Sequence, residues 1–193
     1  MEHFRTARLV VRDWTAADLE ASFAIHGRVE VARWVFPPPG RPVASLAQMQ
    51  RMLDRRVTRS QEHSEYGMWA VELQATSQVI GAVLLRPLRA DRAEVEVGWH
   101  LNPDYWGAGY YPEAGCGVVA LAFGLDRVNP EGAGPGLASP RARPVLDRVV
   151  ALVDPENIRS QRVCRRLGMR HLGQTGHDDR TLELFELTRA ELG

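Results

Sequence analysis

Lysine does not occur in this chain of 193 residues, so all 24 basic residues are arginine. A catalytic lysine is therefore excluded, both as a Schiff-base nucleophile and as the phosphate ligand of a P-loop. Cysteine is scarce too, because Cys116 and Cys164 are the only two. Two cysteines supply neither a disulfide framework nor a four-ligand zinc site. We expect no metal centre and a reducing compartment.

An excess of charge and long apolar runs are also missing. The 24 acidic residues balance the 24 basic ones, whereas broad nucleic-acid binding needs a concentrated basic face. No run reaches the roughly 18 apolar residues of a membrane span. The first residues, MEHFRTARLVV, lack the apolar stretch of a signal peptide. We therefore expect no nucleic-acid or membrane partner and a cytoplasmic location.

What the chain does contain is enough apolar sequence for one domain. Hydrophobic residues are 45% of the chain and charged residues 25%, which is typical of a soluble globular protein with a sizeable core. The exception is the segment at about 129–144, where seven of the sixteen residues are Gly or Pro. It lies between two copies of LDRV, at 125–128 and 146–149. We interpret it as a surface insertion within a single domain that covers residues 1–193.

Hydrophobic periodicity predicts alternating helices and strands. Strands are expected at 7–14, 66–73, 78–88, 93–101, 148–154 and 180–188. Helices are expected from Thr15 to about His26 and at 44–59, 113–125 and 155–168. The polar turn QATS joins the strands at 66–73 and 78–88, which favours an antiparallel meander. The pattern indicates an α/β (α+β) domain.

The stretch DYWGAGYYPEAG, residues 104–115, places two glycines between a predicted strand and a predicted helix. Backbone N–H groups at a helix N-terminus lack intrahelical partners, and the helix dipole makes the position attractive to an anion. Gly109 has no Cβ to obstruct a phosphate, and Pro112 suits a first helical turn. A tight turn with no ligand would also account for Gly107 and Gly109. Both interpretations remain open from this motif alone.

Together with a second motif, the stretch resembles the GNAT acetyltransferase superfamily. PDYWGAGYYPEA followed by VDPENIRSQRVCRRLGM is similar to its Rim-type branch, which acetylates N-terminal amines of ribosomal proteins. The segments TARLVVRDWTAADLEASFAIHGRVEVARWV and EVGWHLNPDYWG are similar to that branch as well. The resemblance implies a mixed, mostly antiparallel twisted sheet of six to seven strands flanked by helices. It also implies acetyl-CoA as the acyl donor and, at family level, a homodimer.

The resemblance assigns a pyrophosphate loop of the form Q/R-x-x-G-x-G/A. Trp106 occupies its first position, Gly109 its fourth and Tyr111 its last. Tyr111 departs from the family, because a small residue is expected there, and its side chain must swing away from the phosphates. The cofactor-binding residues implied are Val97, Trp99, Trp106, Gly107, Ala108, Gly109, Tyr110, Tyr111, Asn157 and Ser160.

Transfer to an amine requires a base, because an ammonium must lose a proton before it attacks the thioester. Strand alternation places Val95, Val97, Trp99 and Leu101 on one face, and Glu94, Glu96 and His100 on the other. Glu96 matches the family position often assigned as the base, and His100 is its rival. These residues would equally suit the solvated side of an amphipathic strand. Gly98 indicates a bulge that would splay the strand and free its backbone for pantetheine.

The leaving thiolate requires an acid or a stabilising contact. Many superfamily members have Tyr seven residues after the position of Asn157, and here that position is Cys164. A thiol is a chemically plausible donor, but the Rim-type branch often has a plain apolar residue at this position, which favours core packing for Cys164. Ser160 is a second candidate for contact with the thiolate. Asn157 would either bind the cofactor or cap the helix.

Trp34, Phe36 and Tyr66, with His100, are the expected wall of the acceptor site. The function that the sequence favours is transfer of acetyl from acetyl-CoA to a primary amine, of a protein N-terminus or of a small molecule, by direct attack in a ternary complex. The alternative is a non-catalytic acyl-CoA-binding or interaction protein on the same fold.

Overall fold

A computed structural model describes residues 1–62, 65–89, 94–125 and 145–192 of the chain. Its centre is an eight-stranded sheet in the order β1-β2-β3-β4-β5-β6-β8-β7. The strands are β1 (Glu2–Arg5), β2 (Leu9–Arg12), β3 (Gly67–Leu73), β4 (Val79–Pro87), β5 (Val95–Leu101), β6 (Arg148–Val153), β7 (Arg170–His177) and β8 (Arg180–Thr188). The predicted insertion at 129–144 lies outside the described residues.

All neighbouring strands are antiparallel except β5 and β6, which are parallel. The mixed, mostly antiparallel sheet flanked by helices is confirmed, but it has eight strands rather than six or seven. The two strands without a sequence prediction, β1 and β7, are the edges of the sheet. The side chains of β7 are largely exposed. An edge strand that buries little shows no alternating apolar pattern, although its backbone pairs normally.

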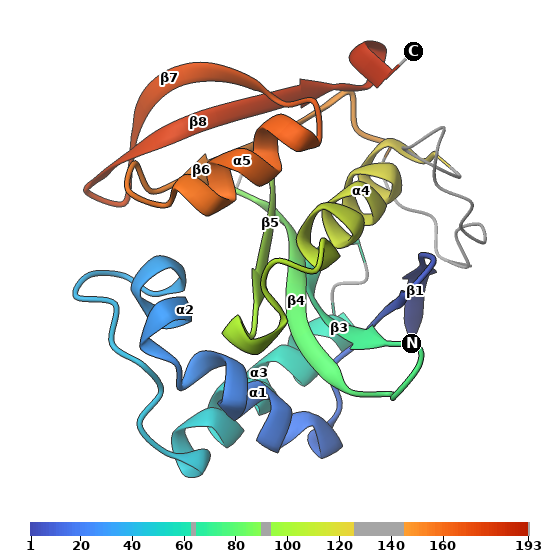
Figure 1. The fold of residues 1–193 in the computed structure, drawn as a ribbon, viewed down its shortest axis with the longest axis vertical. Coiled ribbons are helices and arrows are strands. Elements are labelled where there is room, and N and C mark those ends of the chain that lie inside the picture. The colour runs from blue at the N-terminus through green and yellow to red at the C-terminus, as the bar shows by residue number, and fades with distance from the viewer. Residues whose placement is uncertain (63–64, 90–93, 126–144, 193) are drawn as a thin grey trace.

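Five α-helices are described: α1 (Leu19–His26), α2 (Val29–Val35), α3 (Leu46–Glu62), α4 (Tyr110–Phe123) and α5 (Ile158–Arg166). Figure 1 shows α4 and α5 on one side of the molecule and the group α1, α2 and α3 on the other. The helix α4 begins three residues earlier than predicted, because Gly109 in a left-handed conformation forms its N-cap. The helix α5 begins later than predicted, because Asn157 caps it.

Buried apolar side chains form one cluster on each face of the sheet. Val118 and Phe123 of α4 pack in the larger cluster with Trp69 of β3. Ile25 of α1 and Leu53 of α3 pack in the smaller cluster against alanines of β3 and β4. Because successive side chains of a strand point to opposite faces, both faces of the central strands are covered. The strand β5 is therefore enclosed rather than half-solvated.

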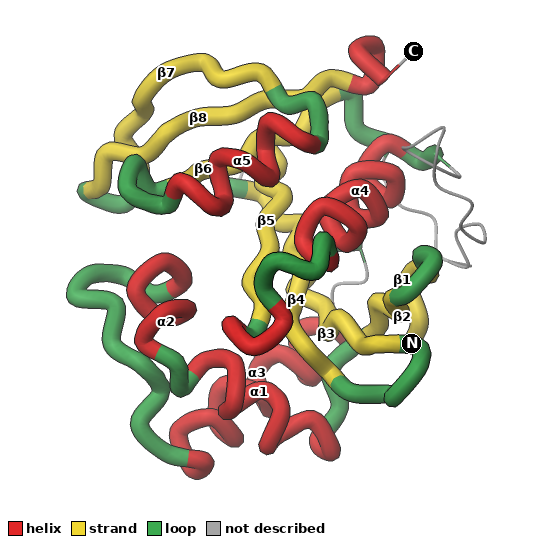
Figure 2. The backbone as a smooth tube through the Cα atoms, viewed as in Figure 1, coloured by secondary structure: helices red, strands yellow, loops and turns green. Residues whose placement is uncertain are grey.

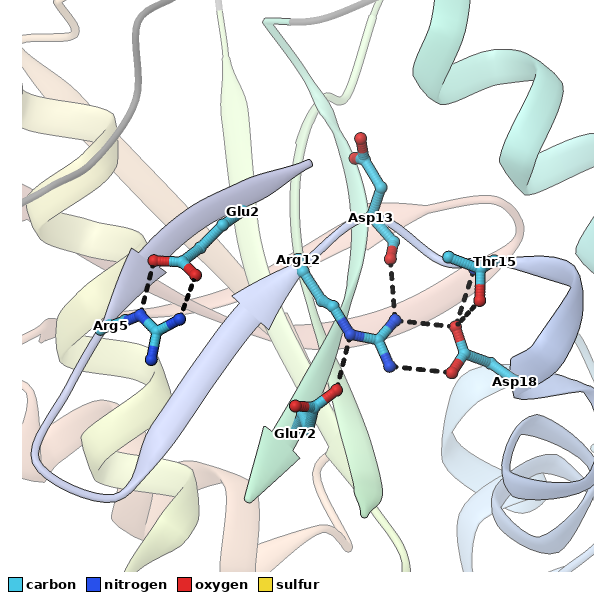
Figure 3. Close-up of polar contacts among 7 residues, drawn as sticks. All are labelled: Glu2, Arg5, Arg12, Asp13, Thr15, Asp18 and Glu72. Carbon is cyan, nitrogen blue, oxygen red and sulfur yellow. Dashed lines mark hydrogen bonds and ion pairs between the residues drawn. The ribbon is translucent and has the colours of Figure 1, made fainter. Parts of the chain in front are cut away.

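Arg12 joins β2 to β3 and to the start of α1, as Figure 3 shows. Its Nε donates to Glu72 at 2.7 Å, and its Nη atoms donate to the carboxylate of Asp18 at 2.8 and 2.9 Å. The backbone N–H of Thr15 also donates to Asp18, at 2.7 Å. Burial alone raises the pKa of Asp18, but these hydrogen bonds outweigh it and lower the pKa below its ordinary value.

We expect Arg12→Met to lower the free energy of unfolding by about 2–3 kcal/mol, because it leaves the buried carboxylate of Asp18 without its charged partner. The exposed pair Glu2–Arg5, also drawn in Figure 3, is the matched control. Arg5→Met should leave the urea midpoint unchanged, since exposed ion pairs contribute little. Equal losses in both variants would contradict the role given to Arg12.

The free energy of unfolding should also depend on pH, because Asp18 is paired with Arg12. The folded-state pKa of Asp18 is lowered, so its contribution is present above the ordinary value near 3.8 and disappears as the pH falls through the folded-state pKa. We expect the wild-type free energy of unfolding to fall as the pH drops below about 4. The Arg12→Met variant should show a flatter dependence in urea titrations over the same range. A parallel dependence in the two proteins would contradict this assignment.

Candidate active site

The strands β5 and β6 part almost as soon as they meet. Their register contains a single pair, Glu96 with Val150. Beyond this pair, the edge of β5 from Val97 to Leu101 has no strand beside it, so its backbone groups are available to another partner. The predicted splay is thus present, but the predicted bulge at Gly98 is wrong, because the β4–β5 register runs without a shift from Val95 to Leu101. Divergence of β6, not distortion of β5, opens the sheet.

Two adjoining cavities lie at this opening. The first, here called the α4 cavity, has a volume of about 380 Å³ and is lined by α2, the end of β5, the start of α4 and the start of α5. The second, the β6 cavity, has a volume of about 290 Å³ and is lined largely by β4, β5, β6 and the β7–β8 turn. Both are lined by Trp34, Val35, Trp99, His100, Asn157 and Ser160. The cavities are therefore two arms of one cleft that meet at the splay.

The glycine turn forms the N-terminus of α4, which is preceded by a loop in Figure 2. Gly107 and Gly109 have φ angles of +84° and +81°, a left-handed conformation that glycine adopts readily. Among the hydrogen bonds of the described residues, none is donated by a backbone N–H of residues 107–111. Five consecutive free donors at a helix N-terminus can bind an anion.

Arg8 lies against this loop, and the sequence pattern did not single it out. Its Nη1 donates to the carbonyl of Ala108 at 2.9 Å, and its guanidinium pairs with Glu113 at 2.6 Å. It also lies over the ring of Tyr110, 4.4 Å from the centroid. Arg159, at the start of α5, lies over the ring of Trp106 at 4.5 Å. Two arginines from distant parts of the sequence therefore flank the free N–H groups.

Tyr111 turns its side chain away from the loop, toward the end of β5. Its hydroxyl accepts a hydrogen bond from the backbone N–H of Leu101 at 2.8 Å, while Trp106 donates from Nε1 to the Leu101 carbonyl at 3.0 Å. Burial raises the pKa of Tyr111 to about 12, so the hydroxyl stays neutral. The unusual tyrosine therefore fastens the free end of β5 instead of covering the loop.

Glu96 and His100 are both buried, so the interpretation of this strand face as solvated is wrong. The carboxylate of Glu96 accepts a hydrogen bond from Arg86 Nε at 2.7 Å and lines the β6 cavity. His100 lines both cavities, and its Nε2 lies 3.1 Å from Nε2 of His26. Burial, with His26 and Arg56 nearby, lowers the pKa of His100 well below its usual range. His100 is consequently neutral and a weak base.

The start of α5 contributes Asn157 and Ser160 to the walls of both cavities. The side-chain oxygen of Asn157 accepts from the Ser160 N–H at 3.2 Å, so Asn157 caps the helix while it lines the cleft. Cys164 lies one turn further on and is fully buried in the core, outside the residues that line either cavity. Burial raises its pKa to about 12. The structure therefore places Cys164 in the core and not where it could protonate a thiolate.

The remaining predicted residues divide between the cleft and its surroundings. Val97 lines the β6 cavity, and Trp34 lines both arms. Phe36 packs beside His26, with ring centroids 6.1 Å apart, and Tyr66 packs against the larger core cluster. Neither of these two lines the described cavities. Arg33 lines the α4 cavity and stacks on Trp34 at 4.0 Å; its position directly before Trp34 was the available sequence signal.

Comparison with known proteins places this geometry in a family. A family profile described as "Acetyltransferase (GNAT) domain" matches residues 8–170. This chain belongs to the GNAT acetyltransferase family. The uncharacterized N-acetyltransferase YnaD of Bacillus subtilis is 25% identical over 171 residues, which are 89% of this chain and 84% of YnaD. Acetyltransferase activity is thereby supported by family and by named relatives.

Solved GNAT structures share the fold at low sequence identity. RimL, a ribosomal L7/L12 alpha-N-protein acetyltransferase solved with coenzyme A, is 12% identical and has a TM-score of 0.71, covering 97% of this chain and 98% of RimL. AAC(6')-Ib, solved with ribostamycin and coenzyme A, is 17% identical and has a TM-score of 0.69, covering 95% and 94% of the two chains. At such identities the likeness establishes the fold alone.

Neither a membrane helix nor a metal cluster is found in the described part of the chain. No helix there is long and apolar enough to cross a membrane. No group of three or more His, Cys, Asp or Glu side chains could hold a metal ion there.

Cys164→Ala tests the placement of the thiol in the core. We expect a loss of about 1 kcal/mol in the free energy of unfolding, from the small cavity that the substitution leaves. Acetyl transfer should keep its wild-type rate, measured by release of free coenzyme A. A rate loss of tenfold or more at unchanged fold would restore Cys164 as the proton donor.

Proposed function

We propose that this protein transfers the acetyl group of acetyl-CoA directly to a primary amine, within a ternary complex. The observation that carries the proposal is the row of five free N–H groups at residues 107–111, which opens onto a cleft at a parted sheet. Acetyl-CoA presents a pyrophosphate for those donors and two pantetheine amides for the free edge of β5. The fit needs no distortion at Tyr111, because its hydroxyl is already bonded to Leu101.

The two arms of the cleft bind different substrates in this proposal. Trp106 and Tyr111 line only the α4 cavity, and Glu96 lines only the β6 cavity. The donor therefore enters through the α4 cavity, past the pyrophosphate loop, and the acceptor enters through the β6 cavity. Donor and acceptor meet between the residues that line both arms.

Glu96 is the proposed base, acting directly or through one water. The ammonium of the acceptor gives one proton to Glu96, and the neutral amine nitrogen bonds to the thioester carbon. The carbon–sulfur bond then breaks and coenzyme A leaves as a thiolate. The nitrogen loses its second surplus proton as the amide forms, and the thiolate takes up a proton to become the free thiol. Ser160 lines both arms, so its hydroxyl is the proposed contact for that sulfur. Backbone N–H groups on the free edge of β5 are the proposed partners of the carbonyl oxygen.

The acceptor class is proposed at the level of a primary amine. RimL acts on a protein N-terminus, and AAC(6')-Ib is solved with an aminoglycoside, yet both share this fold at nearly equal TM-scores. The β6 cavity is rimmed by both charge signs, with Asp154 paired to Arg180 at 2.8 Å. We also propose that residues 1–193 form one GNAT domain.

The affinity of the Gly109→Ala variant for coenzyme A tests the proposed pyrophosphate loop. A left-handed conformation costs a non-glycine residue about 1–2 kcal/mol, so the loop should lose its donor geometry and bind coenzyme A about tenfold more weakly in calorimetry. Gly168→Ala is the matched control, because Gly168 has the same φ of +81° but lies outside both cavities. The Gly168→Ala variant should lose as much stability as Gly109→Ala and bind coenzyme A with wild-type affinity. Absence of wild-type binding at millimolar coenzyme A would refute the proposed function.

The turnover rate of the Glu96→Gln variant tests Glu96 as the base. We expect kcat to fall by about 10²–10⁴-fold, the usual contribution of a general base, while the dissociation constant of acetyl-CoA is unchanged. Glu94→Gln is the control, since Glu94 lies two residues earlier, pairs with Arg148 and is absent from the cavity walls. Assays against a panel of N-terminal peptides and a panel of small amines would identify the acceptor class. Equal rates for Glu96→Gln and wild type would remove Glu96 from the mechanism.

A further inference from the structure

Beneath the cleft, two buried histidines from distant elements meet edge to face. His100 of β5 and His26 of α1 have ring centroids 4.9 Å apart at an interplanar angle of 79°, and their Nε2 atoms are 3.1 Å apart. On the far side of His26, Nδ1 lies 2.8 Å from the backbone carbonyl oxygen of Ser22. Arg56 of α3 places Nη2 3.1 Å from His26 Nε2. Two helices, α1 and α3, and one strand, β5, thus contribute to one chain of polar contacts.

The hydrogen bonds fix the position of each proton. A carbonyl oxygen only accepts, so His26 must carry a proton on Nδ1 to donate to Ser22. Burial, with the charge of Arg56 nearby, lowers the pKa of His26 to about 3, so the ring is neutral and Nε2 is an acceptor. Arg56 Nη2, which can only donate, faces the same lone pair at 3.1 Å. A second lone pair directed at His26 Nε2 would be repelled, so His100 donates from its own Nε2 and shares this acceptor with Arg56. A neutral imidazole with a proton on Nε2 has a bare lone pair on Nδ1.

That lone pair is open to the cleft. No hydrogen bond of the described residues involves Nδ1 of His100, whose described polar partner is His26. Within the same residues, the one buried side-chain polar atom without a partner is Nε1 of Trp14. The unpartnered Nδ1 of His100 is therefore not sealed in protein, and His100 lines both arms of the cleft.

The surrounding charges hold both rings neutral. Arg56 is partly buried, and in the described part of the chain it has no carboxylate within ion-pair distance. The groups whose charges act on His100 are His26 and Arg56. Glu96, four residues earlier on the same strand, is paired with Arg86. An uncompensated guanidinium beside two imidazoles disfavours a further positive charge on either one.

We propose that His26 and Arg56 lock His100 in the tautomer that presents a bare Nδ1 to the cleft, where it accepts a hydrogen bond from the attacking amine and orients its lone pair. His100 is thus an acceptor-binding residue and His26 and Arg56 are positioning residues, while the proton itself goes to Glu96. This inference rests on the proposed acetyltransferase function. It deepens that function by giving the site a neutral acceptor for the N–H of a primary amine. A fixed N–H at the same place would instead donate to the amine nitrogen and occupy the lone pair that attacks.

The tautomer can be measured directly on the wild-type protein by ¹⁵N NMR of labelled histidine side chains. We expect His100 to show an unprotonated Nδ1 and a protonated Nε2, His26 to show the opposite pattern, and both to stay neutral from about pH 8 down to pH 5. A protonated Nδ1 on His100, or titration of its ring near pH 6.5, would overturn the proposal. This readout does not depend on any activity.

Two substitutions distinguish the roles of Nδ1 and Nε2 of His100 in an activity assay. In His100→Asn the amide oxygen can replace the Nδ1 acceptor while the link to His26 is lost; in His100→Gln the amide can keep that link while the Nδ1 acceptor is lost. We expect kcat/KM for the amine to fall at least tenfold further in His100→Gln than in His100→Asn, with coenzyme A affinity equal in both. The reverse order, or equal losses, would overturn the role of Nδ1.

Arg56→Gln tests the lock from outside the cleft, with Arg55→Gln as the matched control on the exposed side of α3. We expect the histidine rings to titrate at higher pH in Arg56→Gln alone, and kcat/KM to fall with them. If the wild type acetylates no amine in either panel, the proposed function fails, and the NMR spectrum alone then decides whether His100 holds the proposed tautomer. Unchanged histidine titration in Arg56→Gln would show that Arg56 does not position His100.

Discussion

The parting of β5 from β6 is the constraint on which the site depends. One pair, Glu96 with Val150, joins two antiparallel blocks of sheet into a single layer. Past that pair, the edge of β5 carries backbone groups in the interior of the protein with no strand to satisfy them. Such groups are costly unless a ligand, water or side chain bonds to them. Trp106 and Tyr111 meet this need at Leu101, and the remaining edge lies along the cleft.

Burial gives the polar residues of β5 their chemistry. Without α1, His100 would lack His26 and would lie on an ordinary strand face. In the folded protein each residue is held by one specific partner: Glu96 by the guanidinium of Arg86, and His100 by His26. In a low-dielectric setting, the partner decides the protonation state. One strand thereby carries an arginine-paired carboxylate and a neutral imidazole four residues apart.

Much of the fold was predictable because its elements follow local rules. The strand at 93–101 and the helix after the glycine turn were predicted from alternation and capping, and the likeness to GNAT proteins supplied the mixed, mostly antiparallel sheet. The edge strands β1 and β7 were missed, since neither buries a continuous apolar face. The bulge at Gly98 was wrong because the opening arises from the path of β6. Arg8, His26 and Arg56 were missed because their partners lie 100, 74 and 30 residues away.

The sequence by itself determined the family, the glycine turn at the start of α4 and the alternation that sets Glu96 and His100 on one face. These properties are local, since they follow from φ preferences, the pleat of a strand and the spacing of motif residues. Only the tertiary structure decided that this face is buried, that Cys164 is a core residue, that Tyr111 bonds to Leu101 and that His26 meets His100. Those outcomes depend on which elements pack together, and packing is a contact between segments that no local spacing specifies.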